Sequence, residues 1–173
     1  ETQDFTILNV DEVPEDCDLI IINAPTSDIS EEEVTMIEDY VALGGHLLVF
    51  SGPTDEDTDL TNLNSIIEAL GITVNEGIVI EGSRDYYAFA QPYILLPTIE
   101  SSDITTALID EKSNVIMPIS AGLSVTGYSD NFETTALLTT SDESFSKIAG
   151  FSLETYDKED GDIEIGRASC RER

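Results

Sequence analysis

"SEEEVTMIEDYVALGGHLLVFSG" (residues 30–52) begins as a helix, stops at two glycines and continues as a strand. Ser30 and Glu33 form a capping-box pattern, in which each side chain accepts a hydrogen bond from the backbone N–H of the other residue. Apolar residues then recur at helical spacing and predict a core-facing stripe: Val34, Ile37 and Val41. Because Gly44 suits a left-handed helix end, the stretch predicts a helix over residues 30–43 and a buried strand after it.

The segments on either side extend this pattern. "DLIIINAP" (18–25) is a nearly continuous β-branched run, which is typical of a strand buried on both faces of a parallel sheet. Strand, helix and strand together predict a right-handed βαβ unit. "TNLNSIIEALG" (61–71) predicts a second helix, and short strands follow it. We therefore expect an α/β fold with parallel strands over residues 18–82 and with Ile21 and Ile37 in its core.

The rest of the chain has a different pattern of predicted elements. An alternating segment at residues 5–10 predicts one more strand, and after residue 82 the strand candidates are short and rich in Thr, Ser and Ile. One short helix is expected within residues 103–111. We expect this half to form a mixed, partly antiparallel C-terminal extension of the sheet. The acidic segment "YDKEDGDIEIG" (156–166) is expected to form a hairpin or a frayed end.

Composition narrows the classes of function. The chain has 173 residues, with 7 basic and 36 acidic side chains and a net charge of −29. Such a surface repels phosphate backbones and anionic lipid, so we expect no nucleic-acid partner and no polybasic membrane patch. Residues 1–166 are expected to form a single domain, whereas "RASCRER" (167–173) resembles an expression-vector tail. Without that tail, Cys17 is the one remaining cysteine and no disulfide framework is indicated.

The residue types that carry chemistry do not fall into catalytic patterns. Cys17 is not in a Gly-x-Cys-x-Gly turn, and His46 starts a strand, whereas active sites in open α/β sheets lie at the carboxyl ends of strands. No glycine-rich phosphate-binding motif occurs. The Asp55–Asp59 run lacks the Gly and Glu of a calcium-binding loop. We therefore expect no catalytic, cofactor-binding or metal-binding residue, and no cofactor.

A crevice is nevertheless expected where the predicted strands end. The carboxyl ends of parallel strands meet on one side of the sheet, which is the ligand side in open α/β folds. The residues expected to line this ligand or partner surface are Asn23, Thr26, Ser51, Thr54, Arg84 and Tyr87. Two interpretations of Arg84 stay open, since it could meet an anion or pair with a nearby carboxylate. The aromatic residues between 86 and 93 could likewise form a binding rim or pack against a strand.

Four blocks in order resemble one known family. "VPEDCDLIIINAPTSDISEEEVTMIEDYVALGGHLLVFSGP" (13–53) is similar to the core of the GldG-like auxiliary proteins of ABC-type transport systems. "LNSIIEALGITVNEGIVIE" (63–81) resembles the segment that follows in that family. "ITTALIDEKSNVIMPISAGL" and "ETTALLTTSDESFSK" resemble its later blocks. The similarity covers roughly residues 5–150.

The resemblance implies a fold, a place and a set of partners. The fold would be Rossmann-like or flavodoxin-like, as in class I amidotransferases, but without catalytic residues. The segment would lie on the extracytoplasmic face of the cell membrane, within a membrane-anchored protein that accompanies an ABC permease and ATPase. Its function would be contact with the permease or with cargo. Family domains usually begin with a further strand and helix, and have a fuller C-terminal region than this chain shows.

Two other classes of function remain open. A degenerate α/β hydrolase or amidotransferase-like enzyme would need a nucleophile and a base near the strand ends, which the sequence does not show. A surface carbohydrate- or ion-binding domain would use the aromatic residues between 86 and 93, or the acidic loops.

Overall fold

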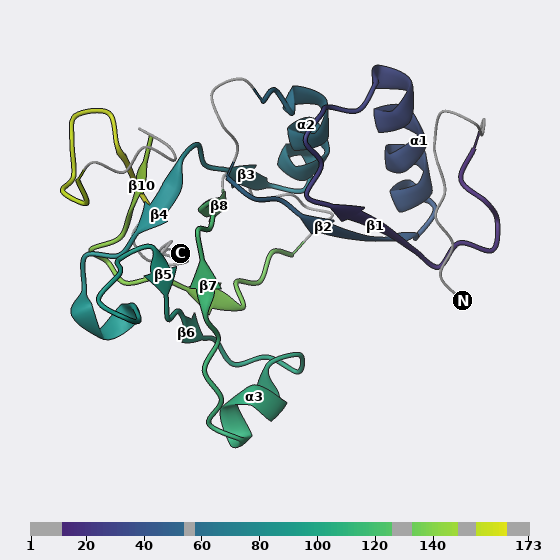
Figure 1. Cartoon of the computed structure of the whole chain (residues 1–173). Helices are drawn as coiled ribbons and strands as arrows, with labels where there is room; N and C mark the ends of the chain where they lie inside the picture. The colour runs from purple at the N-terminus through teal and green to yellow at the C-terminus, as the bar shows by residue number, and fades with distance from the viewer. Residues whose placement is uncertain (1–11, 54–57, 126–132, 149–154, 166–173) are drawn as a thin grey trace.

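Helix α1 forms with the two ends that its sequence predicts. The computed structural model describes residues 12–53, 58–125, 133–148 and 155–165 (Figure 1), and α1 spans Glu31–Ala42. The Ser30 hydroxyl accepts the Glu33 N–H at 3.2 Å, and the Glu33 carboxylate accepts the Ser30 N–H at 2.7 Å. Gly44 has a φ of +95°, and the Gly45 N–H closes the helix by donating to the Tyr40 carbonyl at 3.0 Å.

Strands β1 (Leu19–Asn23) and β2 (His46–Phe50) flank this helix in the sequence and pair in parallel. Tyr40 fixes the start of both strands, because its hydroxyl donates to the Cys17 carbonyl at 3.2 Å and accepts the His46 N–H at 3.3 Å. A Cβ at Gly45 would lie 2.3 Å from the Tyr40 ring. The second glycine of the Gly-Gly pair therefore leaves room for the ring that joins the two strands.

The remaining elements are short. Helix α2 spans Thr61–Ala69, η2 is a 3₁₀ turn at Arg84–Tyr86 and α3 spans Thr106–Asp110. The first later strands are β3 (Ile72–Val74), β4 (Ile78–Ile80), β5 (Ile94–Leu95) and β6 (Thr98–Ile99). They are followed by β7 (Met117–Pro118), β8 (Leu123–Val125), β9 (Leu138–Thr139), β10 (Phe145–Lys147) and β11 (Ile163–Glu164).

The expectation of a Rossmann-like or flavodoxin-like parallel sheet is wrong. Within the described ranges, β1 and β2 are the only parallel pair. The other strands form small antiparallel sheets: β3 with β8, β5 with β7, β6 with β9, and β10 between β4 and β11. A parallel neighbour needs a crossover of a dozen or more residues, whereas only residues 75–77 separate β3 from β4. The later strands are therefore not an extension of the β1–β2 pair.

Buried apolar side chains gather in two regions. The first lies on β1, α1 and α2, where Ile20, Ile37 and Leu63 are buried. The second joins β4 to β10, where Ile78, Ile80 and Phe145 form a cluster with Tyr93 packed against it. The burial of Ile37 matches the expected helix stripe. Ile21, however, is half exposed, so the expectation that β1 is buried on both faces is wrong.

Candidate functional site

The structure brings together the residues at the ends of β1 and β2. Asn23 lies opposite Phe50 in the register, and the Ala24 N–H donates to the Phe50 carbonyl at 2.8 Å. Ser51 follows directly and is half-buried. Thr26 is exposed in the loop after β1. Thr54 lies outside the described residues.

Asp28, in the loop after β1, contacts the N-terminus of helix α2. Its carboxylate accepts the Asn62 N–H at 2.8 Å and the Leu63 N–H at 3.0 Å, so a residue of the β1 loop caps helix α2. Helix N-termini attract anions because their N–H groups are unpaired. These two N–H groups of α2 therefore already have a carboxylate as their partner.

Arg84 and Tyr87 do not join this group. They lie in and just after η2, which follows β4, and Figure 1 shows β4 on the opposite side of the molecule from α1. The guanidinium donates to the Tyr87 hydroxyl at 3.5 Å and lies 5.9 Å from the centre of its ring. The two residues were expected beside Asn23 because β4 was expected in the parallel sheet, but β4 pairs with β10 instead.

The aromatic segment around Tyr87 is divided between core and surface. Tyr93 packs against the β4–β10 cluster, and its ring centre lies 5.8 Å from that of Tyr156. Phe89, by contrast, is 78% exposed. The segment therefore supports the β4–β10 core at one end and exposes a single large ring near the other.

Cys17 and His46, the residues most able to act in catalysis, meet Tyr40 through their backbones. Both lie at the amino ends of β1 and β2, opposite the strand ends where Asn23 and Ser51 lie. Within the described residues, no group of three or more His, Cys, Asp and Glu side chains is placed to hold a metal ion.

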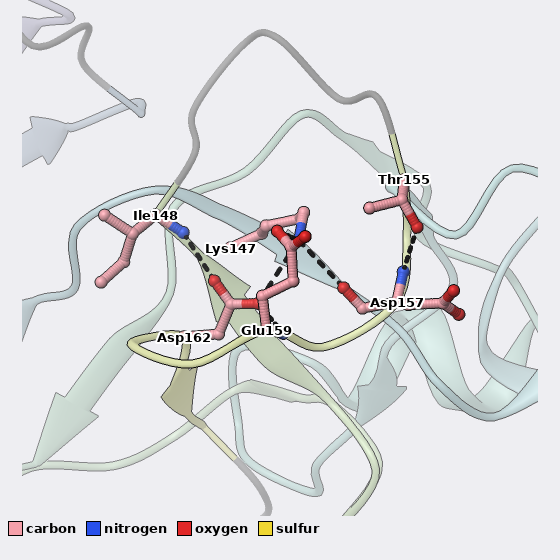
Figure 2. Close-up of polar contacts among 6 residues, drawn as sticks. All are labelled: Lys147, Ile148, Thr155, Asp157, Glu159 and Asp162. Carbon is pink, nitrogen blue, oxygen red and sulfur yellow. Dashed lines mark hydrogen bonds and ion pairs between the residues drawn. The ribbon is translucent and has the colours of Figure 1, made fainter.

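A buried lysine forms a polar cluster that sequence reasoning missed. The Lys147 side chain is 1% exposed, and its ammonium lies 2.7 Å from the Glu159 carboxylate and 3.5 Å from that of Asp162. It also donates to the Asp157 carbonyl at 2.9 Å (Figure 2). Asp162 in turn accepts the Ile148 N–H at 3.1 Å and the Glu159 N–H at 2.8 Å. The acidic segment thus closes over Lys147 and returns as β11 beside β10.

The charges in this cluster stabilise one another. The bond to Glu159 raises the pKa of Lys147, although burial acts in the opposite direction. Burial would raise the pKa of Asp162, but the backbone N–H groups of Glu159 and Ile148 and the Lys147 ammonium hold it below its ordinary value. Lys147 therefore holds the acidic segment beside β10, and we call Lys147, Glu159 and Asp162 together the clasp. Its signal in the sequence was the rarity of basic residues beside a segment of closely spaced acids.

The β1–β2 pair exposes an apolar face. Figure 1 shows α1 and α2 on the same side of the two strands. Large apolar side chains alternate outward from the strands and are exposed to between 41% and 52%: Leu19, Ile21, Leu48 and Phe50. The register places Ile21 opposite Leu48 and Asn23 opposite Phe50, so the outward side chains share one face. We call these four apolar side chains the open face. The expected crevice residue Asn23 borders it.

One solved structure similar to this chain is described as "mmIFT52 N-terminal domain". It has 25% sequence identity and a TM-score of 0.56, and the match covers 73% of this chain and 54% of that one. The chain thus spans about half the length of the solved structure that it matches. No curated protein gives a match. None of the helices in the described ranges is long and apolar enough to cross a membrane.

The model of one protein family matches residues 1–162, which is most of the chain. That family is described as "ABC-type uncharacterized transport system". The blocks that resemble transport auxiliary proteins all lie within the matched range, including those that form α1, β1 and β2. The chain therefore belongs to this family, as an auxiliary component of an ABC transport system.

Proposed function

We propose that this chain is a GldG-like, non-catalytic contact module within the auxiliary component. It acts on the extracytoplasmic face of the cell membrane, in a membrane-anchored protein, and contacts the permease or its cargo. The family supports the link to an ABC transport system. The extracytoplasmic location and the contact with the permease or cargo are our proposals.

The open face is the observation that supports a contact function. Four large apolar side chains on two adjacent strands remain about half exposed. Covering each of them would contribute roughly 1–2 kcal/mol, at about 25 cal/mol per Å² of apolar surface. Adjacent exposed apolar side chains on a folded surface are typical of interaction sites. A contact module needs such a surface and needs no nucleophile.

Residues that could support an enzyme make structural contacts, and for Cys17 and His46 these are contacts of the backbone. The backbones of Cys17 and His46 anchor the strand starts through Tyr40, and Lys147 holds the acidic segment. Asp28 occupies the helix end that would otherwise attract an anionic substrate. The contacts of Lys147 and Asp28 support a contact module, because they use these side chains to hold the fold together.

The test is association with the other subunits of the transport system. The protein is co-expressed with the permease and ATPase of its transport system and purified through a tag on the permease. We expect it to co-purify at physiological salt. The Ile21→Asn/Phe50→Asn double variant should lose at least tenfold of this association, whereas Phe89→Asn, on another exposed apolar residue, should keep it. Failure of the wild-type protein to associate with any subunit would contradict the proposed function.

A further inference from the structure

The open face is a diagonal apolar stripe with polar corners. Leu19 and Ile21 project from β1, and Leu48 and Phe50 from β2. In the register, Leu19 lies opposite His46 and Asn23 opposite Phe50. The apolar side chains therefore run from the start of β1 to the end of β2, with His46 and Asn23 at the two remaining corners. Such a stripe matches the apolar side of one strand or helix laid across it.

The surroundings of this stripe carry one sign of charge. Exposed acidic residues come directly before β1: Glu15, Asp16 and Asp18. No Lys or Arg precedes Arg84 in the sequence. The helices and strands that form the open face and its support therefore contain no basic side chain other than His46. The long-range field around the stripe attracts cationic groups and repels anionic ones.

We propose that the open face binds a protein segment whose apolar side chains are flanked by lysine or arginine. This inference rests on the proposed contact function and names the chemistry of the partner. The apolar stripe supplies the buried contact, and the acidic rim steers the basic flanks of the partner into place. A second copy of this chain would bring the same acidic rim against itself. An anionic lipid surface would be repelled for the same reason.

The test uses short synthetic peptides and the folded chain. One peptide alternates leucine and threonine between pairs of lysines, a second replaces the lysines by glutamates, and a third keeps the lysines but replaces leucine by serine. We expect the first peptide to bind at least tenfold more tightly than either of the others. Its affinity should fall as salt rises.

Variants locate the binding site. Ile21→Asn/Phe50→Asn should weaken binding of the first peptide at least tenfold without changing the net charge. Phe89→Asn, with its side chain 78% exposed in the wild type, should change it less than twofold. Asp16→Asn/Asp18→Asn should weaken binding and lower its salt dependence. Unchanged thermal unfolding of each variant shows that the fold is kept.

Several results would overturn the inference. These are no binding of the leucine–lysine peptide, equal binding of the serine peptide, or equal affinity in the open-face variant. Dimerisation that Ile21→Asn/Phe50→Asn abolishes would instead assign the face to a second copy. Binding to anionic vesicles that needs the same residues would assign it to a membrane. The proposed function fails separately, if the transport subunits do not associate with the wild-type chain. If the subunits associate equally well with the wild-type chain and the open-face variants, only the inference fails.

Discussion

Gly45 and Tyr40 form a contact on which the start of both parallel strands depends. A Cβ at Gly45 would lie 2.3 Å from the ring of Tyr40, and the hydroxyl of that ring bridges Cys17 and His46. We expect Gly45→Ala to lower the free energy of unfolding by about 1–3 kcal/mol, the usual range for overpacking. Urea unfolding measures this. Gly52→Ala is the control, because a Cβ there meets nothing within 4 Å; equal losses in both variants would contradict this role.

Among the basic residues that the structure describes, Lys147 is the one whose loss we expect to lower stability most. Lys147→Met leaves Asp162, which is 5% exposed, without its ammonium partner. Breaking a buried pair in this way costs about 3 kcal/mol at neutral pH. Urea unfolding measures the loss. Lys158→Met is the control, because it breaks the exposed pair with Glu164 and should cost much less. Similar losses in the two variants would contradict the clasp.

The same cluster predicts a dependence on pH. The pKa of Asp162 is lower in the folded chain than its ordinary value of 3.8, so its contribution is present above that value and is lost as the pH falls through the folded pKa. The raised pKa of Lys147 places the loss of its contribution in the alkaline range. The difference in unfolding free energy between wild type and Lys147→Met should therefore be full at neutral pH and shrink below about pH 4. A difference that stays constant down to pH 2 would contradict the pairing.

At the scale of elements, truncating a side chain should lower the free energy of unfolding by different amounts on the two faces of the β1–α1 unit. Ile37 is 0% exposed and Ile21 is 52% exposed. Ile37→Ala should cost about 2–5 kcal/mol, the range for deleting a buried aliphatic side chain. Ile21→Ala should cost well under half as much, because much of its side chain is already in water. Denaturant unfolding compares the two. Equal costs would mean that the open face is packed in solution.

Local signals specified α1 well. Its capping box, apolar stripe and Gly44 end lie within a few residues of one another, so they could be found in the sequence. The parallel register of β1 and β2 followed from the helix between them. The apolar run of β1 was misleading, since Leu19 and Ile21 face outward. A β-branched run records strand propensity, but it does not show whether a second layer covers the strand.

The pairing of the later strands could not be predicted from the sequence, for a different reason. β3 pairs with β8 and β4 with β10, and in both cases the partners lie far apart in the sequence. Segments of two or three residues carry too few side chains to specify a partner. The contacts of the clasp could not be predicted either, because Asp162 and Glu159 reach Lys147 only after β11 has folded back beside β10. Arg84 was misplaced with them, because its position depends on β4.

At the scale of the whole molecule, the chain combines one half-covered parallel pair with several small antiparallel sheets. The solved structure that it matches is covered over 54% of its length, and the family match extends over residues 1–162. The layer that is most regular, formed by α1, α2, β1 and β2, also carries the open face. One side of β1 and β2 is therefore packed under the helices and supports stability, and the other side carries the open face.

Cysteine labelling tests the central claim most directly. In a Cys17→Ser/Cys170→Ser background, Ile20→Cys and Ile21→Cys place thiols at adjacent positions that are 5% and 52% exposed in the wild type. We expect a maleimide to label Ile21→Cys at least tenfold faster than Ile20→Cys in the free chain. Adding the permease and ATPase should slow labelling of Ile21→Cys but not of Phe89→Cys. Equal labelling of the two free variants, or unchanged labelling of Ile21→Cys with the subunits bound, would contradict the account.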